Sequence, residues 1–175
     1  MRKLEAAIIV IFVLCITNAA RANDVFVARE SALHGYFDYP CEKFGIPKPL
    51  AMAIARQESG MNPLALNLAG MDVYPKNISA ALAIAKWAEK RGISYDVGLM
   101  QINSYWIRKY KIPLSALLHP RSNIYVGCWI LRQEIGRHGF SWKAVGRYHS
   151  PTEWRAHEYA KIIRGHLKNI IVAYK

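Results

Sequence analysis

A glutamate stands at the end of a stretch with the pattern of a buried helix, ARQESGMNP (residues 55–63). Helical spacing places Glu58 on one face with three small or apolar residues, Ala51, Ile54 and Ala55. A carboxyl group on a buried face, at the negative end of a helix dipole, is disfavoured in its charged form. A carboxylic acid that keeps its proton near neutral pH can act as a general acid. For Glu58 alone, the alternative is an ion pair with Arg56 or another basic residue.

A second stretch, DVGLMQINSYW (residues 96–106), places two amides next to aromatic side chains. The amides are Gln101 and Asn103, and the aromatic residues are Tyr105 and Trp106. Amides beside aromatic rings suit a carbohydrate ligand, because a sugar has hydroxyl edges and apolar C–H faces. The alternative is a loop that packs on the core, with its amides hydrogen-bonded to the backbone.

A third stretch, AVGRYHSP (residues 144–151), brings Tyr148 and His149 directly before the last predicted helix. The Tyr148 phenol could donate a hydrogen bond to Glu58 or to a sugar. The alternative is an aromatic side chain that packs against the start of that helix.

The elements that must position these residues are predicted to be helices. Pro47 and Pro49 start the helix that carries Glu58, and Gly60 ends it. Ser79 is expected to cap another helix, and SPTE at residues 150–153 is a capping box with proline at the first helical position. The expected helices cover residues 27–44, 47–58, 79–91, 124–138 and 150–174, with irregular chain over 61–78. We therefore expect an all-α or mainly α single domain.

The first 22 residues have the pattern of a secretory signal peptide. A positive start, an apolar run over residues 6–16 and an A-x-A site at residues 20–22 follow one another. The apolar run is shorter than the ~20 residues that a spanning helix needs. We expect cleavage after residue 22 and a mature domain over residues 23–175; an uncleaved anchor is the alternative.

The chain is strongly basic, with a formal net charge of +12. A basic exported protein suits an acidic polymer, such as nucleic acid, anionic lipid or a cell-wall glycan, or the charge only aids solubility. The positive residues are scattered along the chain instead of forming one arm or recognition helix. Export and this scatter argue against a nucleic-acid partner.

Two cysteines, Cys41 and Cys128, follow the predicted signal peptide. An even number of cysteines in an exported chain predicts a disulfide, with two free buried thiols as the alternative. The six histidines lack the paired spacing of metal ligands, and two cysteines alone do not hold zinc. We expect no metal and no organic cofactor.

Taken in order, these segments resemble the soluble lytic transglycosylase domain. The resemblance rests on Glu58-Ser59 at a helix end, on the GLMQ run at residues 98–101 and on the Tyr148 segment, and it spans roughly residues 38–160. The runs DVGLMQIN and GRYHSP, with the cysteine pair, are similar to the small single-domain members. Those members accompany secretion systems, conjugation machineries and pili in Gram-negative bacteria.

The resemblance implies a lysozyme-like fold and a specific reaction. Members cut the β-1,4 bond between N-acetylmuramic acid and N-acetylglucosamine in peptidoglycan and leave 1,6-anhydromuramyl ends without adding water. Glu58 matches the single catalytic glutamate, which acts first as acid and then as base. The implied partners are peptidoglycan strands and the components of a secretion, conjugation or pilus machine, and the implied place is the periplasm. Nothing in the sequence suggests more than a monomer.

The resemblance also implies residues that bind the substrate. Gln101 and Asn103 match positions that contact the sugar, and Tyr148 matches a tyrosine that positions the glutamate. The other expected members of the binding set are Met100, Ser59 and His149, with Ser59 serving mainly to support the helix end. The sequence departs from the larger enzymes at YHSP (residues 148–151), where they usually have tyrosine-asparagine-alanine-glycine. The segment over 64–95 is also longer than theirs.

Two other functions fit the same residues. A lysozyme-type hydrolase on this fold would need a second carboxylate to hold a water, and Asp96 is the candidate. A non-catalytic glycan-binding module or assembly factor would need no acid, and Glu58 argues against it.

Overall fold

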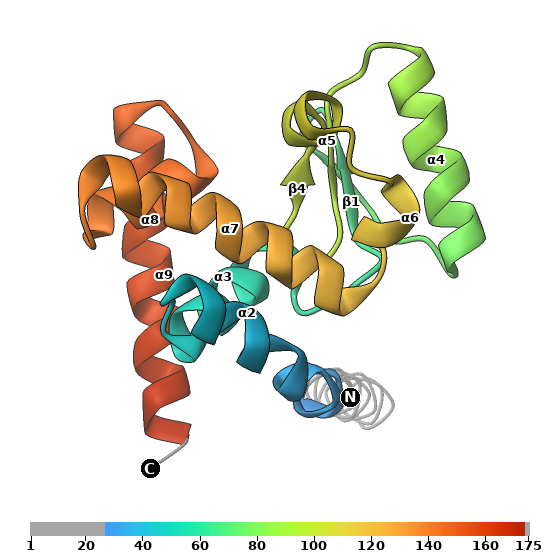
Figure 1. The fold of residues 1–175 in the computed structure, drawn as a ribbon. Coiled ribbons are helices and arrows are strands. Elements are labelled where there is room, and N and C mark those ends of the chain that lie inside the picture. The colour runs from blue at the N-terminus through green and yellow to red at the C-terminus, as the bar shows by residue number, and fades with distance from the viewer. Residues whose placement is uncertain (1–26, 174–175) are drawn as a thin grey trace, which may run out of the picture.

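The computed structural model describes residues 27–173, so the predicted signal peptide lies outside the described residues. A helix over residues 27–33 is followed by helices and a small sheet, and α7 runs through the middle of the molecule (Figure 1). The helices are η1 (His34–Phe37), α2 (Asp38–Phe44), α3 (Lys48–Ser59), α4 (Ile78–Lys90), α5 (Ser104–Tyr110), α6 (Leu114–Leu117), α7 (Pro120–His138), α8 (Trp142–His149) and α9 (Glu153–Ala173). Between residues 27 and 173, no helix is both long and apolar enough to span a bilayer. The expected mainly α, single-domain fold is confirmed.

Helix α3 forms where the sequence predicts it. Pro47 occupies the N-cap position, and a second proline lies in the first turn, where a missing N–H costs nothing. The helix ends at Gly60, which takes a left-handed conformation with φ of 58°. The residues from Leu50 to Ala55 are all buried, and the helix packs against α9. This packing fixes the last turn of α3, which carries Glu58.

The expected first helix, over residues 27–44, is interrupted. The chain forms the 3₁₀ helix η1 between the helix over 27–33 and α2. Pro40 lies in the first turn of α2. It lacks the N–H that a continuous helix would pair with the carbonyl of Tyr36, so α2 must start afresh.

The segment over 61–78, expected to be irregular, contains half of a four-stranded antiparallel sheet. The strands are β1 (Leu66–Leu68), β2 (Met71–Val73), β3 (Tyr95–Val97) and β4 (Ile102–Asn103), in the order β2-β1-β3-β4. The register pairs Asp72 with Asn67, Asn67 with Asp96, and Asp96 with Asn103. These four polar residues therefore form one row across the sheet. The strands are too short for a period-two pattern, and aspartate and asparagine are poor strand formers.

Two predicted helix starts are wrong, by one residue at α4 and by three residues at α9. Helix α4 is capped by Asn77, whose Oδ1 accepts a hydrogen bond of 2.9 Å from the Ala80 N–H, and not by Ser79. Helix α9 begins at Glu153, because Ser150 and Pro151 belong to a turn in which the Ser150 Oγ accepts from the N–H of Thr152. The segment with Tyr148 and His149 is itself a helix, α8, which the sequence did not indicate.

The two cysteines meet in the core as free thiols. Cys41 of α2 and Cys128 of α7 are both buried, and their side chains are in hydrogen-bonding contact. The hydrogen bond lowers the pKa of Cys41 and raises the pKa of Cys128. The structure therefore has two thiols where the sequence predicts a disulfide. The disulfide stays a prediction, for an oxidising compartment.

We expect the oxidised protein to melt at a higher temperature than the reduced protein. On the chain-entropy model, a bond between Cys41 and Cys128 would add about 4–5 kcal/mol to the free energy of unfolding, less any strain. Thermal melts with and without reductant, together with thiol titration, measure this difference. Cys41→Ala is the control, since its melt should not respond to reductant. Equal melting temperatures for the wild type would establish free thiols.

Candidate active site

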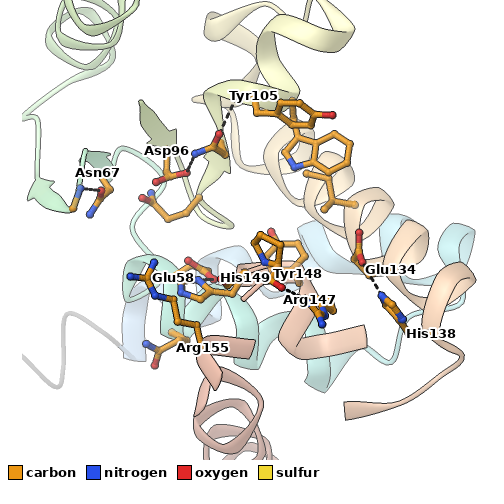
Figure 2. A pocket seen from close by; sticks show the side chains of 18 of the residues that line it. Glu58, Asn67, Asp96, Tyr105, Glu134, His138, Arg147, Tyr148, His149 and Arg155 are labelled. Carbon is orange, nitrogen blue, oxygen red and sulfur yellow. Dashed lines mark hydrogen bonds and ion pairs between the residues drawn. The ribbon is translucent and has the colours of Figure 1, made fainter. Parts of the chain in front are cut away.

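A cleft of about 1050 Å³ lies between the sheet and helices α7, α8 and α9 (Figure 2). Eight of the residues singled out from the sequence for catalysis or sugar binding line it: Glu58, Asp96, Gln101, Asn103, Tyr105, Trp106, Tyr148 and His149. Segments from three distant parts of the chain thus meet at one concave surface.

Glu58 presents its carboxyl group to this cleft, with a side chain that is 12% exposed. Its Oε1 accepts a hydrogen bond of 2.6 Å from the hydroxyl of Tyr159 on α9. The same oxygen lies 3.8 Å from Nδ1 of His149 on α8. Arg56 instead forms an ion pair of 2.6 Å with Glu30. The alternative prediction, an ion pair of Glu58 with Arg56 or another basic residue, is therefore wrong for Arg56, and the basic residue beside Glu58 is His149.

His149 and Tyr159 hold each other beside the carboxyl group. Their rings are stacked, with centroids 4.6 Å apart and planes 2° from parallel. The neighbouring carboxylate of Glu58 is the main reason that the pKa of His149 is raised, and burial acts in the opposite direction. The charged imidazolium is thus favoured next to Glu58. The ion pair between His149 and Glu58 is lost as the pH rises through the raised pKa of His149, because the imidazolium then gives up its proton.

We expect Glu58→Gln to lower the pKa of His149, because the amide carries no charge to favour the imidazolium. A titration of the imidazole C–H signals by NMR measures the shift. An unchanged titration curve for His149 would show that Glu58 does not stabilise the imidazolium in solution.

The tyrosine that contacts Glu58 is not the one that the sequence predicts. Tyr148 lines the cleft, but its hydroxyl donates a hydrogen bond of 2.7 Å to the carbonyl of Met100. The positioning contact comes from Tyr159, which sequence reasoning missed. Tyr159 lies on the apolar face of α9 with Ala156 and Ile163, all buried, so its pattern is that of a core residue.

We expect Tyr159→Phe to lower kcat about ten- to hundredfold, because hydrogen bonds to charged groups contribute roughly 1.5–3 kcal/mol. KM should change little, since Tyr159 acts through Glu58. Tyr148→Phe is the matched variant: it removes a hydrogen bond to a backbone carbonyl, so the larger effect should fall on stability. Steady-state kinetics and thermal melts of both variants separate the two roles. A larger loss of kcat in Tyr148→Phe would restore the predicted assignment.

The row of polar residues across the sheet lines the cleft opposite α8 and α9. The Nδ2 of Asn103 donates to Asp96 at 2.8 Å, and the Nδ2 of Asn67 donates to Asp72 at 2.7 Å. Burial raises the pKa of Asp96 to about 6, and the hydrogen bond from Asn103 acts against this. The paired carboxylates and amides form a fixed polar wall that can bind hydroxyl groups.

Gln101 joins this wall from the turn between β3 and β4. Its backbone has a positive φ of 44°, which is uncommon outside glycine. Its Nε2 donates to the carbonyls of Ala65 at 3.0 Å and Gly98 at 2.8 Å. Both amide hydrogens thus anchor the side chain, and the carbonyl oxygen is the group left for a ligand.

Ser59 and Met100, both expected to bind substrate, do not line the cleft. Ser59 Oγ donates to the carbonyl of Leu99 at 2.9 Å and accepts from the N–H of Asn62. It thereby ties the end of α3 to the β3–β4 turn. Met100 is fully buried and packs on Gly127 of α7. Neither side chain therefore reaches the substrate directly. Ser59 and Met100 instead help to fix the elements that carry the residues of the cleft.

A buried asparagine that the sequence did not indicate holds the same turn. Asn123 of α7 accepts a hydrogen bond of 2.7 Å from the Met100 N–H and donates to the carbonyls of Val97 and Leu117. Asn123 can come this close only because residue 98 is a glycine: a Cβ on Gly98 would lie 2.2 Å from the Asn123 Nδ2. Gly98 also has a φ of +80°, which other residues rarely adopt. The turn that carries Gln101 is therefore fixed by the core.

The expected aromatic surface is present at one end of the cleft. Tyr105 and Trp106 of α5 both line it, with ring centroids 5.2 Å apart in an edge-to-face contact. Tyr105 is 53% exposed, so its ring can pack on the apolar face of a sugar.

Comparison with known proteins gives one family and several relatives. The model of the transglycosylase SLT domain matches residues 35–164. Invasion protein IagB of Salmonella typhi is 35% identical over 113 residues, which are 62% of this chain and 58% of IagB. Type IV secretion system protein virB1 of Brucella abortus is 30% identical over 93 residues, 52% of this chain and 39% of virB1. Protein IpgF of Shigella sonnei is 26% identical over 120 residues, 66% of this chain and 65% of IpgF.

The alignments thus span little more than half of the length of the IagB relatives. The match to the family covers most of the chain and includes every residue that forms the site around Glu58. This chain belongs to the transglycosylase SLT domain family.

Proposed function

We propose that this protein is a peptidoglycan lytic transglycosylase. It cleaves the β-1,4 bond between N-acetylmuramic acid and N-acetylglucosamine and leaves a 1,6-anhydromuramyl end. One observation carries the proposal: in a chain of the SLT family, the Glu58 carboxyl group faces the cleft and is held there by Tyr159 and His149. This is the place and the kind of group that an acid/base catalyst requires.

In the proposed reaction, Glu58 moves one proton in each of two steps. The protonated carboxyl group first gives its proton to the glycosidic oxygen, and the bond from that oxygen to C1 of the muramyl sugar breaks. The 2-acetamido group stabilises the cationic C1. The carboxylate then takes the proton of the C6 hydroxyl as the C6 oxygen bonds to C1. No water is consumed, so a single carboxyl group suffices.

The polar and aromatic walls of the cleft suit the sugars on either side of this bond. Gln101 and Asn103 offer amide groups from the sheet side, and Tyr105 and Trp106 offer ring faces and edges from α5. Tyr148 and His149 lie on the opposite side, in α8. These residues are proposed to bind the glycan, with His149 also acting on Glu58.

A lysozyme-type hydrolase is the second candidate, because Asp96 lines the same cleft as Glu58. Burial raises the pKa of Asp96 to about 6, so it is largely ionised at neutral pH and could hold a water as general base. Its carboxylate already accepts a hydrogen bond from Asn103. The transglycosylase needs no such base, and Asp96 would then serve only to bind the sugar.

Digestion of purified sacculi, followed by mass spectrometry of the released muropeptides, separates the two candidates. A transglycosylase yields 1,6-anhydro ends, and a hydrolase yields reducing ends with one additional water. Asp96→Asn should retain the anhydro products if Glu58 acts alone. Loss of all cleavage in Asp96→Asn, with reducing ends in the wild type, would favour the hydrolase.

The proposed setting is the periplasm of a Gram-negative bacterium, where the enzyme would open the wall for a secretion, conjugation or pilus apparatus. The names of the relatives, an invasion protein and a type IV secretion system protein, support such a machine as partner. Cleavage of a signal peptide after residue 22, a mature domain over residues 23–175 and a monomeric state are part of this proposal.

A further inference from the structure

Three arginines line the cleft, and two of them are engaged by neighbouring groups. Arg137 of α7 forms a hydrogen bond to the buried carboxylate of Glu134. Arg147 of α8 donates to the carbonyl of Pro151 and, at 2.6 Å, to Glu153. Both guanidinium groups are thus held by neighbouring groups of the protein, although the buried Nε of Arg147 has no hydrogen-bond partner among the described residues.

Arg155 differs from the other two. Among residues 27–173, no hydrogen bond or ion pair engages its guanidinium group, which lies 5.3 Å from the ring centroid of its neighbour Trp154. Trp154 is 65% exposed. A guanidinium stacked on an aromatic ring keeps its N–H donors in the plane and ready for a ligand.

The position of Arg155 ties it to the reacting group. It precedes Tyr159 by four residues on α9, so both side chains share one face of that helix. Figure 2 shows Arg155 beside Glu58 and His149 at the same end of the cleft. Its charge acts against protonation of His149. An uncompensated cation thus stands next to the site where the glycan would be cut.

The natural ligand of such a group is a carboxylate, which a guanidinium binds through two parallel hydrogen bonds. N-acetylglucosamine has no carboxylate. The muramyl sugar carries one on its lactyl substituent, either as the free lactyl carboxylate or, where a stem peptide is attached, as the carboxylates of that peptide. We propose that Arg155 binds a carboxylate of the muramyl substituent at or next to the cleaved bond.

This inference rests on the proposed function and adds a specificity to it. Arg155 distinguishes peptidoglycan from neutral polymers of N-acetylglucosamine, and it acts on binding rather than on the proton transfers of Glu58. Arg155→Ala in the active enzyme should therefore raise KM on sacculi, with kcat little changed. Arg155→Lys keeps the charge but not the paired donors, so it should restore binding only in part.

Binding to the inactive Glu58→Gln protein tests the inference without relying on catalysis. Calorimetry would compare three oligomers: one with stem peptides, one stripped to free lactyl carboxylates and one made of N-acetylglucosamine alone. Arg155→Ala should weaken binding of at least one carboxylate-bearing oligomer about tenfold or more and leave the neutral oligomer unchanged. Arg164→Ala is the matched control, because Arg164 also lies on α9 over a tryptophan, Trp142 at 4.7 Å, but outside the cleft.

The pattern of losses identifies the carboxylate. A loss confined to the stem-bearing oligomer assigns the peptide, and a loss confined to the stripped oligomer assigns the lactyl group. Equal losses on all three oligomers, no loss on any, or no binding at all would overturn the inference. If binding of a carboxylate-bearing oligomer depended on Arg155 but the wild type failed to cut sacculi, the inference would stand and the proposed enzymatic activity would be wrong.

Discussion

Glu58→Gln is expected to abolish glycan cleavage, with a loss of about a thousandfold or more, while the protein folds normally. General acid–base catalysis contributes roughly 10²–10⁴-fold, and here one group supplies both the acid and the base. The glutamine has the same shape, and its carbonyl oxygen can still accept the hydrogen bond from Tyr159. The free energy of unfolding should therefore stay within about 1 kcal/mol of the wild type.

Release of muropeptides from sacculi measures the loss of cleavage, and circular dichroism measures whether the protein is folded and how stable it is. Glu89→Gln is the matched control, because Glu89 is an exposed glutamate on α4 that pairs with Arg108, away from the cleft. That variant should cleave sacculi as the wild type does. If Glu58→Gln retained substantial activity, Glu58 could not be the acid, and Asp96 would become the first alternative.

Asn123→Ala is expected to lower the free energy of unfolding by about 3–5 kcal/mol. The substitution removes the side-chain partner of one N–H and two carbonyl groups in a fully buried place. Each unsatisfied buried group costs roughly 1–3 kcal/mol. Because those groups belong to the turn that carries Gln101, cleavage should also fall in protein that remains folded.

Chemical denaturation of the wild type and the variant measures this loss. Asn77→Ala removes the same side chain from the exposed start of α4, where it accepts one hydrogen bond. That control should lose only about 1 kcal/mol, as is usual for a helix cap. Losses of equal size in the two variants would mean that Asn123 does not hold the turn in the way its contacts indicate.

The sequence predicts the elements whose signals are local. Pro47 and Gly60 mark the ends of α3, and helical spacing places Glu58 on its buried side. The GLMQ run and the Tyr148 segment follow in the order typical of the family. The family, the mainly α fold and the residue most suited to acid/base chemistry could be recognised for this reason.

The sequence does not predict contacts that depend on the packing of distant elements. Tyr159 is separated from Glu58 by 101 residues and looks like a core tyrosine, so nothing local indicates its hydrogen bond. Asn123 looks like an ordinary residue near a helix start, although three buried groups depend on it. Asn67 and Asp72 are unfavourable in strands, so the polar row is visible only once the sheet is formed.

The central claim is that Glu58 cuts peptidoglycan without adding water, and digestion of sacculi in heavy-oxygen water tests it most directly. Each muropeptide end released by the mature protein would be analysed by mass spectrometry for the label and for the anhydro mass. We expect 1,6-anhydro ends that contain no heavy oxygen. Reducing ends that carry one heavy oxygen would contradict it and would identify a hydrolase, for which Asp96 is the candidate base.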